Sequence, residues 1–104
     1  MITRKEPEEC QDMLDIRQEI DNIDRHIISL IGKRFRYVKS AAKFKKEKSD
    51  VAAPERLKTM LIQRRVWATE FELSPDVIEK LFLDLVNHFI LEESKAWDKF
   101  KSRS

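Results

Sequence analysis

The sequence predicts an all-α protein, and three observations support this prediction. Apolar residues recur at intervals of three and four along most of the chain. One glycine and three prolines among 104 residues leave too few turn-forming residues for β-hairpins. Two of the prolines, Pro54 and Pro75, stand where a proline commonly begins a helix. We therefore expect three helices in a single domain covering residues 1–104.

The first predicted helix covers residues 12–48 and is unusually long. Asp12 is suited to cap its first turn. Its apolar stripe advances by four, three, four and three residues and contains Ile16, Ile20, Ile23, Ile27 and Leu30. About 36 residues make a helix of roughly 54 Å, whereas a compact domain of this size is roughly 33 Å across. The stripe would therefore project into water unless a second copy of the chain covered it.

The charge distribution along this helix favours an intertwined homodimer. Residues 6–24 contain eight acids and one cation, Arg17, whereas residues 33–48 contain eight cations and one acid, Glu47. Acids at the start and bases at the end suit the helix macrodipole. The same distribution favours antiparallel contact between two copies.

Proline and a capping serine mark the two remaining helices. The second is expected from Pro54 to residues 69–72, and the third from Pro75, which follows the N-cap residue Ser74. The stripe of the third helix contains Ile78, Phe82, Leu85, Phe89, Ala96 and Phe100. Residues 46–52, between the first two helices, are expected to form a mobile polar connection.

Charged residues interrupt two of the apolar stripes. Arg34 takes the stripe position after Leu30, and Glu93 takes the position after Phe89. Lys45 follows Arg34 by eleven residues, which on one helix is within about 20° of the same face and ~16 Å along the axis. Two cations at this spacing suit an anion of small-metabolite size. A buried charge is costly without a partner, so Arg34 and Glu93 must meet a ligand, an opposite charge or water.

Two more arginines are candidates for the same site. Arg17 lies ~25 Å from Arg34 along the predicted helix, so it reaches that region only from a second, antiparallel copy. Arg56 stands near the start of the second helix, where a cation is unfavourable unless an anion is bound nearby. The pattern alone leaves structural roles open as well: an ion pair between Arg34 and Glu93, a solvated Lys45, a pair between Arg17 and Asp21, and an exposed Arg56.

Several classes of protein and site are disfavoured. A single cysteine, Cys10, excludes an intrachain disulfide, and His26 and His88 lack the spacing of a metal pair. No apolar run approaches a membrane span of ~18 residues, and the N-terminus lacks an apolar signal sequence, so we expect a cytoplasmic protein without membrane partners. Trp67 and Trp97 are interpreted as core or rim packing.

A nucleic-acid-binding helical dimer is a rival of a different class. It would use residues 33–48 and would lose affinity steeply with salt. Cations exceed anions by only 2 (21 minus 19), and the basic residues share a face with apolar ones, so binding of nucleic acid is not expected. A purely structural coiled coil would have no need of Arg34 and Glu93.

An ordered set of short segments extends along nearly the whole chain: Asp15-Ile16-Arg17, Ile20-Asp21, Ile23-Asp24, Gly32-Lys33-Arg34, Tyr37-Val38-Lys39, Phe44-Lys45, Ala53-Pro54-Glu55-Arg56, Met60-Leu61, Trp67-Ala68, and Leu81-Phe82 to Glu92. Taken in order, these segments resemble the all-helical chorismate mutase family, and within it the isochorismate-pyruvate lyase branch of salicylate (siderophore) biosynthesis. The resemblance implies an intertwined dimer with two sites and an enzyme without metal or cofactor. It also implies a dianionic substrate, isochorismate or chorismate.

Residue roles are implied by the same resemblance. Arg17 of the opposite subunit and Arg34 would grip the two substrate carboxylates, and Lys45 would lie near the enolpyruvyl ether oxygen. Arg56 matches a further active-site arginine. Mutases commonly have a glutamate where this chain has Leu57, which favours the lyase.

Glu93 takes the place of a glutamine of bacterial mutases and the lyase, and fungal-type mutases have glutamate there. It could assist the ether oxygen only when protonated. The expected activity is conversion of isochorismate to salicylate and pyruvate, with chorismate mutase activity as a secondary reaction. The alternative is a chorismate mutase that forms prephenate.

Overall fold

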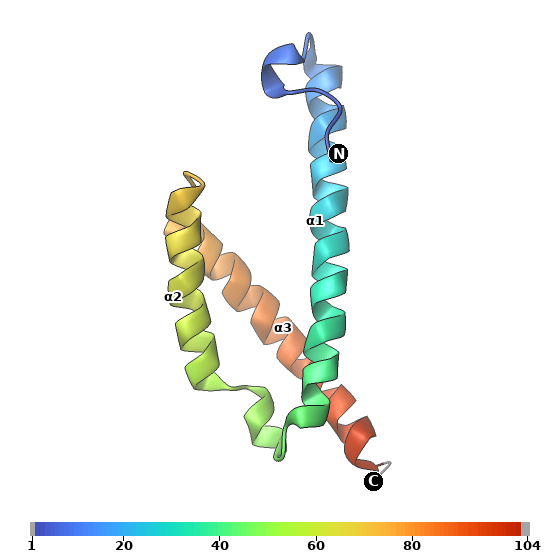
Figure 1. Ribbon diagram of the computed structural model, residues 1–104, viewed down its shortest axis with the longest axis vertical. Helices are drawn as coiled ribbons and strands as arrows, with labels where there is room; N and C mark the ends of the chain where they lie inside the picture. The colour runs from blue at the N-terminus through green and yellow to red at the C-terminus, as the bar shows by residue number, and fades with distance from the viewer. Residues whose placement is uncertain (1, 103–104) are drawn as a thin grey trace. The chain divides into compact units, whose positions relative to one another are not determined.

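The structure is a computed structural model that describes residues 2–102, and all of its regular secondary structure is helical (Figure 1). The α-helices are α1 (Met13–Ala41), α2 (Pro54–Glu70) and α3 (Pro75–Ser102). Three short 3-10 helices are η1 (Pro7–Glu9), η2 (Ala42–Phe44) and η3 (Lys48–Val51). Residues 2–102 contain no strand, so the prediction of an all-α chain with three helices is confirmed. No helix in this range is both long and apolar enough to cross a bilayer.

Contacts between Cα atoms divide the chain into two units, Met1–Arg36 and Tyr37–Ser104. The first unit contains η1 and most of α1, and the second contains η2, η3, α2 and α3.

Helix α1 begins as predicted but ends earlier. The Asp15 N–H donates to Asp12 Oδ1 at 2.8 Å, which is the expected cap. The predicted end at Lys48 is wrong, because the α-helix stops at Ala41 after 29 residues. These residues span roughly 44 Å, so α1 is still longer than a compact domain of this size.

The N-terminal segment folds back over the first turns of α1 (Figure 1). The backbone N–H groups of Arg4 and Lys5 both donate to Glu19 Oε2, at 2.6 and 2.5 Å. The Lys5 ammonium also pairs with Asp15 Oδ2 at 2.9 Å. The hydrogen bond from the Lys5 side chain lowers the pKa of Asp15, and the bond from the Lys5 backbone lowers the pKa of Glu19. The segment is thus fastened to two carboxylates on α1.

The segment between α1 and α2 is anchored by apolar contacts, which the prediction of a polar connection over residues 46–52 missed. Ala42 in η2 is completely buried, and Val51 in η3 is 4% exposed. Both 3-10 helices contact α3. Ala53 then adopts a left-handed conformation, with φ 41°, directly before Pro54. The segment therefore has a defined path from η2 to the start of α2.

Helices α2 and α3 form an antiparallel pair joined by a short turn (Figure 1). Their starts agree with the sequence prediction, since Pro54 opens α2 and the Val77 N–H donates to Ser74 Oγ at 3.4 Å. Met60 and Ala68 of α2 are buried. On α3 the buried residue is the acidic Glu93.

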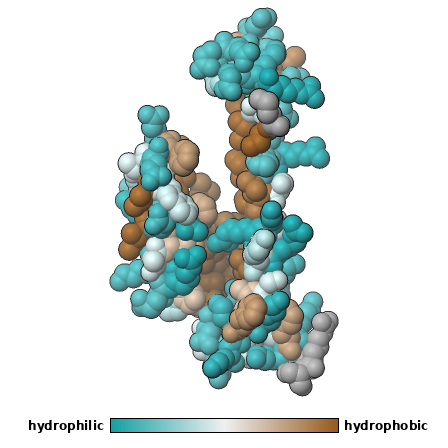
Figure 2. Space-filling model, in the orientation of Figure 1, coloured by the Kyte–Doolittle hydropathy of each residue, from teal (hydrophilic) through white to brown (hydrophobic). Residues whose placement is uncertain are grey.

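Much of the apolar surface of the single chain is exposed. On α1, the stripe residues Ile20, Ile23, Ile27 and Leu30 are between 41% and 49% exposed. Figure 2 shows the resulting hydrophobic band along this helix. Across residues 2–102, the buried hydrophobic residues are Ala42, Val51, Met60 and Ala68, all in the second unit. The apolar face of α1 thus lacks a cover within the first unit.

Candidate active site

The second unit brings Lys45 and Glu93 into direct contact. The Lys45 Nζ lies 3.4 Å from Glu93 Oε2, which makes an ion pair between the end of η2 and the middle of α3. The two side chains are 25% and 8% exposed. Because Glu93 occupies the apolar face of α3, its burial follows from the helical periodicity of the sequence. The expected partner for this buried charge is therefore present, and it is Lys45.

The Glu93 carboxylate has unused hydrogen-bonding capacity. Its Oε2 atom is buried and accepts no hydrogen bond within the part of the chain that the structure describes. The contact with Lys45, at 3.4 Å, is an ion pair rather than a short charge-assisted bond, which would measure about 2.7–2.9 Å. Buried polar atoms without a hydrogen-bond partner are rare in folded proteins, and each calls for an explanation. Glu93 is thus placed to meet a further polar group.

Lys45 is held through its backbone and its side chain. It follows η2 in an extended conformation, φ −85° and ψ 129°, and its N–H donates to the Ala42 carbonyl at 3.2 Å. Its carbonyl accepts a hydrogen bond from the Trp97 indole at 3.0 Å. Its ammonium donates to the Asp50 carbonyl at 3.2 Å. Because α1 ends at Ala41, the prediction that Arg34 and Lys45 share one helical face is wrong.

Arg17 and Arg34 both belong to α1 in the first unit. Arg17 is exposed, and Arg34 is partly buried. Their separation of 17 positions corresponds to ~25 Å of helix, so one α1 cannot direct both guanidinium groups at a single small molecule. Participation of Arg17 in the site of a second copy stays a prediction.

Arg56 and Leu57 lie in the first turn of α2. Arg56 is exposed and Leu57 is partly buried. The first turn of a helix presents unpaired N–H groups and a positive dipole end, so a cation there has no intrahelical compensation. An exposed Arg56 is compatible with binding an anion and with a plain surface position, so its role stays a prediction.

Trp97 and Asp50 contact Lys45, and the sequence analysis assigned neither to the site. Trp97 was interpreted as packing, whereas its indole bonds the Lys45 backbone. A signal was available, since Trp97 follows Glu93 by four residues and so shares its face of α3. Asp50 contacts Lys45 through its backbone carbonyl. Every residue type has this group, so the sequence could not indicate the contact.

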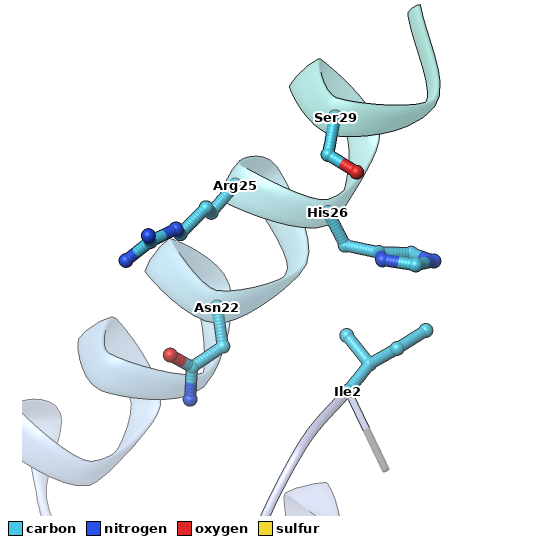
Figure 3. A pocket seen from close by; sticks show the side chains of 5 residues that line it. All are labelled: Ile2, Asn22, Arg25, His26 and Ser29. Atoms are coloured by element: carbon cyan, nitrogen blue, oxygen red, sulfur yellow. The ribbon is translucent and has the colours of Figure 1, made fainter. Parts of the chain in front are cut away.

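A separate pocket of about 610 Å³ lies on the first unit, and Figure 3 shows the residues that line it, namely Ile2, Asn22, Arg25, His26 and Ser29. The Arg25 and His26 side chains point to opposite sides of α1 in that view. None of the predicted site residues lines the pocket. It therefore offers no convergent set of charges for the expected dianion.

Comparison with known proteins defines the class of this helical chain. Residues 16–94 match the family described as chorismate mutase type II. The chain therefore belongs to the chorismate mutase type II family, and the resemblance inferred from the sequence is confirmed. Membership implies an enzyme that acts on chorismate-like small molecules.

Three individual relatives carry different names. The chain is 41% identical over 93 residues to an isochorismate pyruvate lyase of Pseudomonas aeruginosa, a match that covers 89% of this chain and 92% of that protein. It is 38% identical over 87 residues to a T-protein of Haemophilus influenzae, covering 83% of this chain and 22% of the relative. It is 31% identical over 90 residues to a bifunctional chorismate mutase/prephenate dehydratase of Buchnera aphidicola, covering 86% and 23%. The chain thus spans under a quarter of the latter two proteins and nearly all of the first.

Proposed function

We propose that the chain is an isochorismate-pyruvate lyase that converts isochorismate to salicylate and pyruvate. The observation that supports this choice is the likeness to the Pseudomonas lyase, which extends over nearly the full length of both chains. Leu57 adds support, because the mutase branch that the sequence resembles commonly has a glutamate at that position. An aliphatic side chain cannot hold a substrate hydroxyl by a hydrogen bond.

In the proposed reaction, the C–O bond of the enolpyruvyl ether breaks while a ring hydrogen moves to the methylene carbon of the departing fragment. The fragment leaves as pyruvate, and the ring becomes aromatic salicylate. No nucleophile is required, so the protein contributes by holding the substrate in its reactive conformer. Arg34, and Arg17 of the partner subunit, would bind the two carboxylates through their planar forks of donors.

Lys45 is proposed to stabilise the charge that develops on the ether oxygen as the bond breaks. Its ammonium is a compact charge that is fixed by contacts with Glu93 and the Asp50 carbonyl. A donor positioned before the reaction needs little reorganisation when the charge appears, which makes such groups effective. The Glu93 carboxylate compensates the lysine charge in this ion pair.

Chorismate mutase is the second candidate activity, because the matching family and the Buchnera relative carry that name. Incubation of the protein with isochorismate and, separately, with chorismate distinguishes the two. We expect salicylate fluorescence from isochorismate and slower formation of prephenate from chorismate. Prephenate formation without any salicylate would assign the chain to the mutases.

A homodimer with shared sites is part of the proposal, with residues 1–104 forming one domain in each copy. The apolar band of α1 is exposed in the single chain, and burial of an isoleucine stabilises by about 1.5–3 kcal/mol. On α1, the acidic residues between Asp15 and Asp24 and the basic residues between Lys33 and Lys39 complement each other when two such helices run antiparallel. This arrangement would bring Arg17 of the partner subunit toward Lys45.

Glu93→Gln tests whether a hydrogen-bond donor at this position assists the ether oxygen. A carboxylate only accepts hydrogen bonds, whereas a glutamine of the same size donates through its amide N–H and can still accept from Lys45 through its amide oxygen. We therefore expect the variant to match or exceed the wild-type kcat for salicylate formation, measured by salicylate fluorescence. Glu92→Gln is the matched control on the same helix, because Glu92 pairs with the surface residue Lys95. A folded Glu93→Gln variant with kcat well below wild type would exclude this role.

A further inference from the structure

Helix α3 contacts Lys45 at two points that are one helical turn apart. Glu93 binds the side-chain ammonium, and Trp97 binds the backbone carbonyl. Residues four apart lie on one face of a helix, so both contacts come from the same face of α3. The hydrogen bond from the indole measures 3.0 Å, which is an ordinary length for N–H···O, and it is partly buried.

The backbone contact occurs where Lys45 would otherwise be least constrained. Lys45 lies past the last α-helical residue, Ala41, and its extended ψ takes its carbonyl out of any helical hydrogen-bond ladder. A lysine side chain has four rotatable bonds, so the position of its ammonium depends on where its backbone is fixed. Without the indole, the part-buried Lys45 carbonyl would lose this hydrogen bond. The backbone of Lys45 would keep the bond from its N–H to the Ala42 carbonyl.

We propose that Trp97 is a positioning residue, whose indole N–H fixes the backbone of Lys45 so that the ammonium lies beside Glu93. This inference rests on the proposed function, in which that ammonium stabilises the ether oxygen. It assigns Trp97 a role in catalysis through Lys45, without contact between Trp97 and the substrate. A misplaced ammonium weakens an interaction made mainly in the transition state, while the arginines continue to bind the carboxylates.

Trp97→Phe tests the proposal, because it keeps an aromatic ring and removes the donor. We expect kcat for salicylate formation to fall roughly 10- to 100-fold with KM changed less than about threefold. Trp67→Phe is the matched control, since Trp67 lies on α2 and its ring contacts Arg64. It should leave both constants close to wild type. A wild-type kcat in a folded Trp97→Phe variant would overturn the proposal.

An NMR measurement separates this proposal from the proposed function. In Trp67→Phe protein, the single indole N–H signal belongs to Trp97, and we expect slow exchange with solvent because the N–H is bonded to the Lys45 carbonyl. The Lys45 Cε signal, assigned by its loss in Lys45→Ala, should shift in Trp97→Phe and stay in place in Trp67→Phe. These results would support positioning even in a protein without lyase activity. Exchange of the Trp97 indole N–H as fast as that of a free indole would overturn the proposal. This measurement is made on Trp67→Phe protein, so it remains decisive if Trp97→Phe fails to fold.

Discussion

Lys45→Ala is expected to lower kcat for salicylate formation by roughly 10²–10³-fold, the loss typical of removing one donor to a developing oxyanion. The ammonium is held by Glu93 at 3.4 Å and by the Asp50 carbonyl at 3.2 Å, so it occupies a defined place before substrate binds. Its removal leaves the ether oxygen without this charge in the transition state. Initial rates followed by salicylate fluorescence give the effect directly.

The same substitution removes the partner of the buried Glu93 carboxylate, so loss of structure must be separated from loss of chemistry. Lys45→Met keeps much of the aliphatic stem and, combined with Glu93→Gln, leaves no buried charge unpaired. Helicity by circular dichroism identifies the folded variants. Lys58→Ala, at an exposed position on α2, is the control that should retain wild-type rates. A folded Lys45 variant with near-wild-type kcat would contradict the proposed chemistry.

Mixing Arg17→Ala with Lys45→Ala is expected to restore activity that neither variant has alone. In a shared site, Lys45 of one chain works with Arg17 of the partner subunit. Each mixed dimer then contains one site with both residues intact and one site that lacks both. Random exchange makes half of the dimers mixed, so about a quarter of all sites should recover. The mixture is prepared by unfolding and refolding the two variants together, and its kcat is compared with that of either variant refolded alone.

The outcome depends on where Arg17 acts. Were Arg17 and Lys45 to serve the same site from one chain, no mixed dimer would contain an intact site, and activity would stay at the level of the separate variants. A mixture of Arg17→Ala with Arg17→Lys is the control. Both variants lack Arg17, so no dimer in this mixture contains an intact site. Recovery of about a quarter of wild-type activity only in the first mixture would establish the shared site.

The sequence predicted the helical elements where the determinants are local. Ser74 and Pro75 start α3, and Pro54 starts α2, because capping and proline geometry act over a few residues. The end of α1 could not be predicted in this way. It depends on burial of Ala42 and on the bond from Trp97 to the Lys45 carbonyl, which come from contacts with α3. Tertiary contacts of this kind override helix propensity.

The candidate site was predicted in part for the same reason. Glu93 was visible as a charge on an apolar stripe, since helical periodicity alone places it in the interior. Its contact with Lys45 depends on the path of the chain after Ala41, where the sequence predicted a helix to Lys48 and a polar connection over residues 46–52. The buried Val51 that anchors this segment is a single apolar residue without periodic neighbours, so no pattern marks it. The roles of Arg17, Arg34 and Arg56 remain predictions for the experiments above.

The small number of buried side chains affects the stability of the folded protein in solution. A chain whose interior residues are few, and largely small, gains little by folding alone, so association supplies much of the driving force in the proposed dimer. The balance between folded and unfolded chains would then follow the law of mass action, and dilution would lower the melting temperature. In a cell, the rate of synthesis would determine the number of chains and also the fraction of them that is able to work.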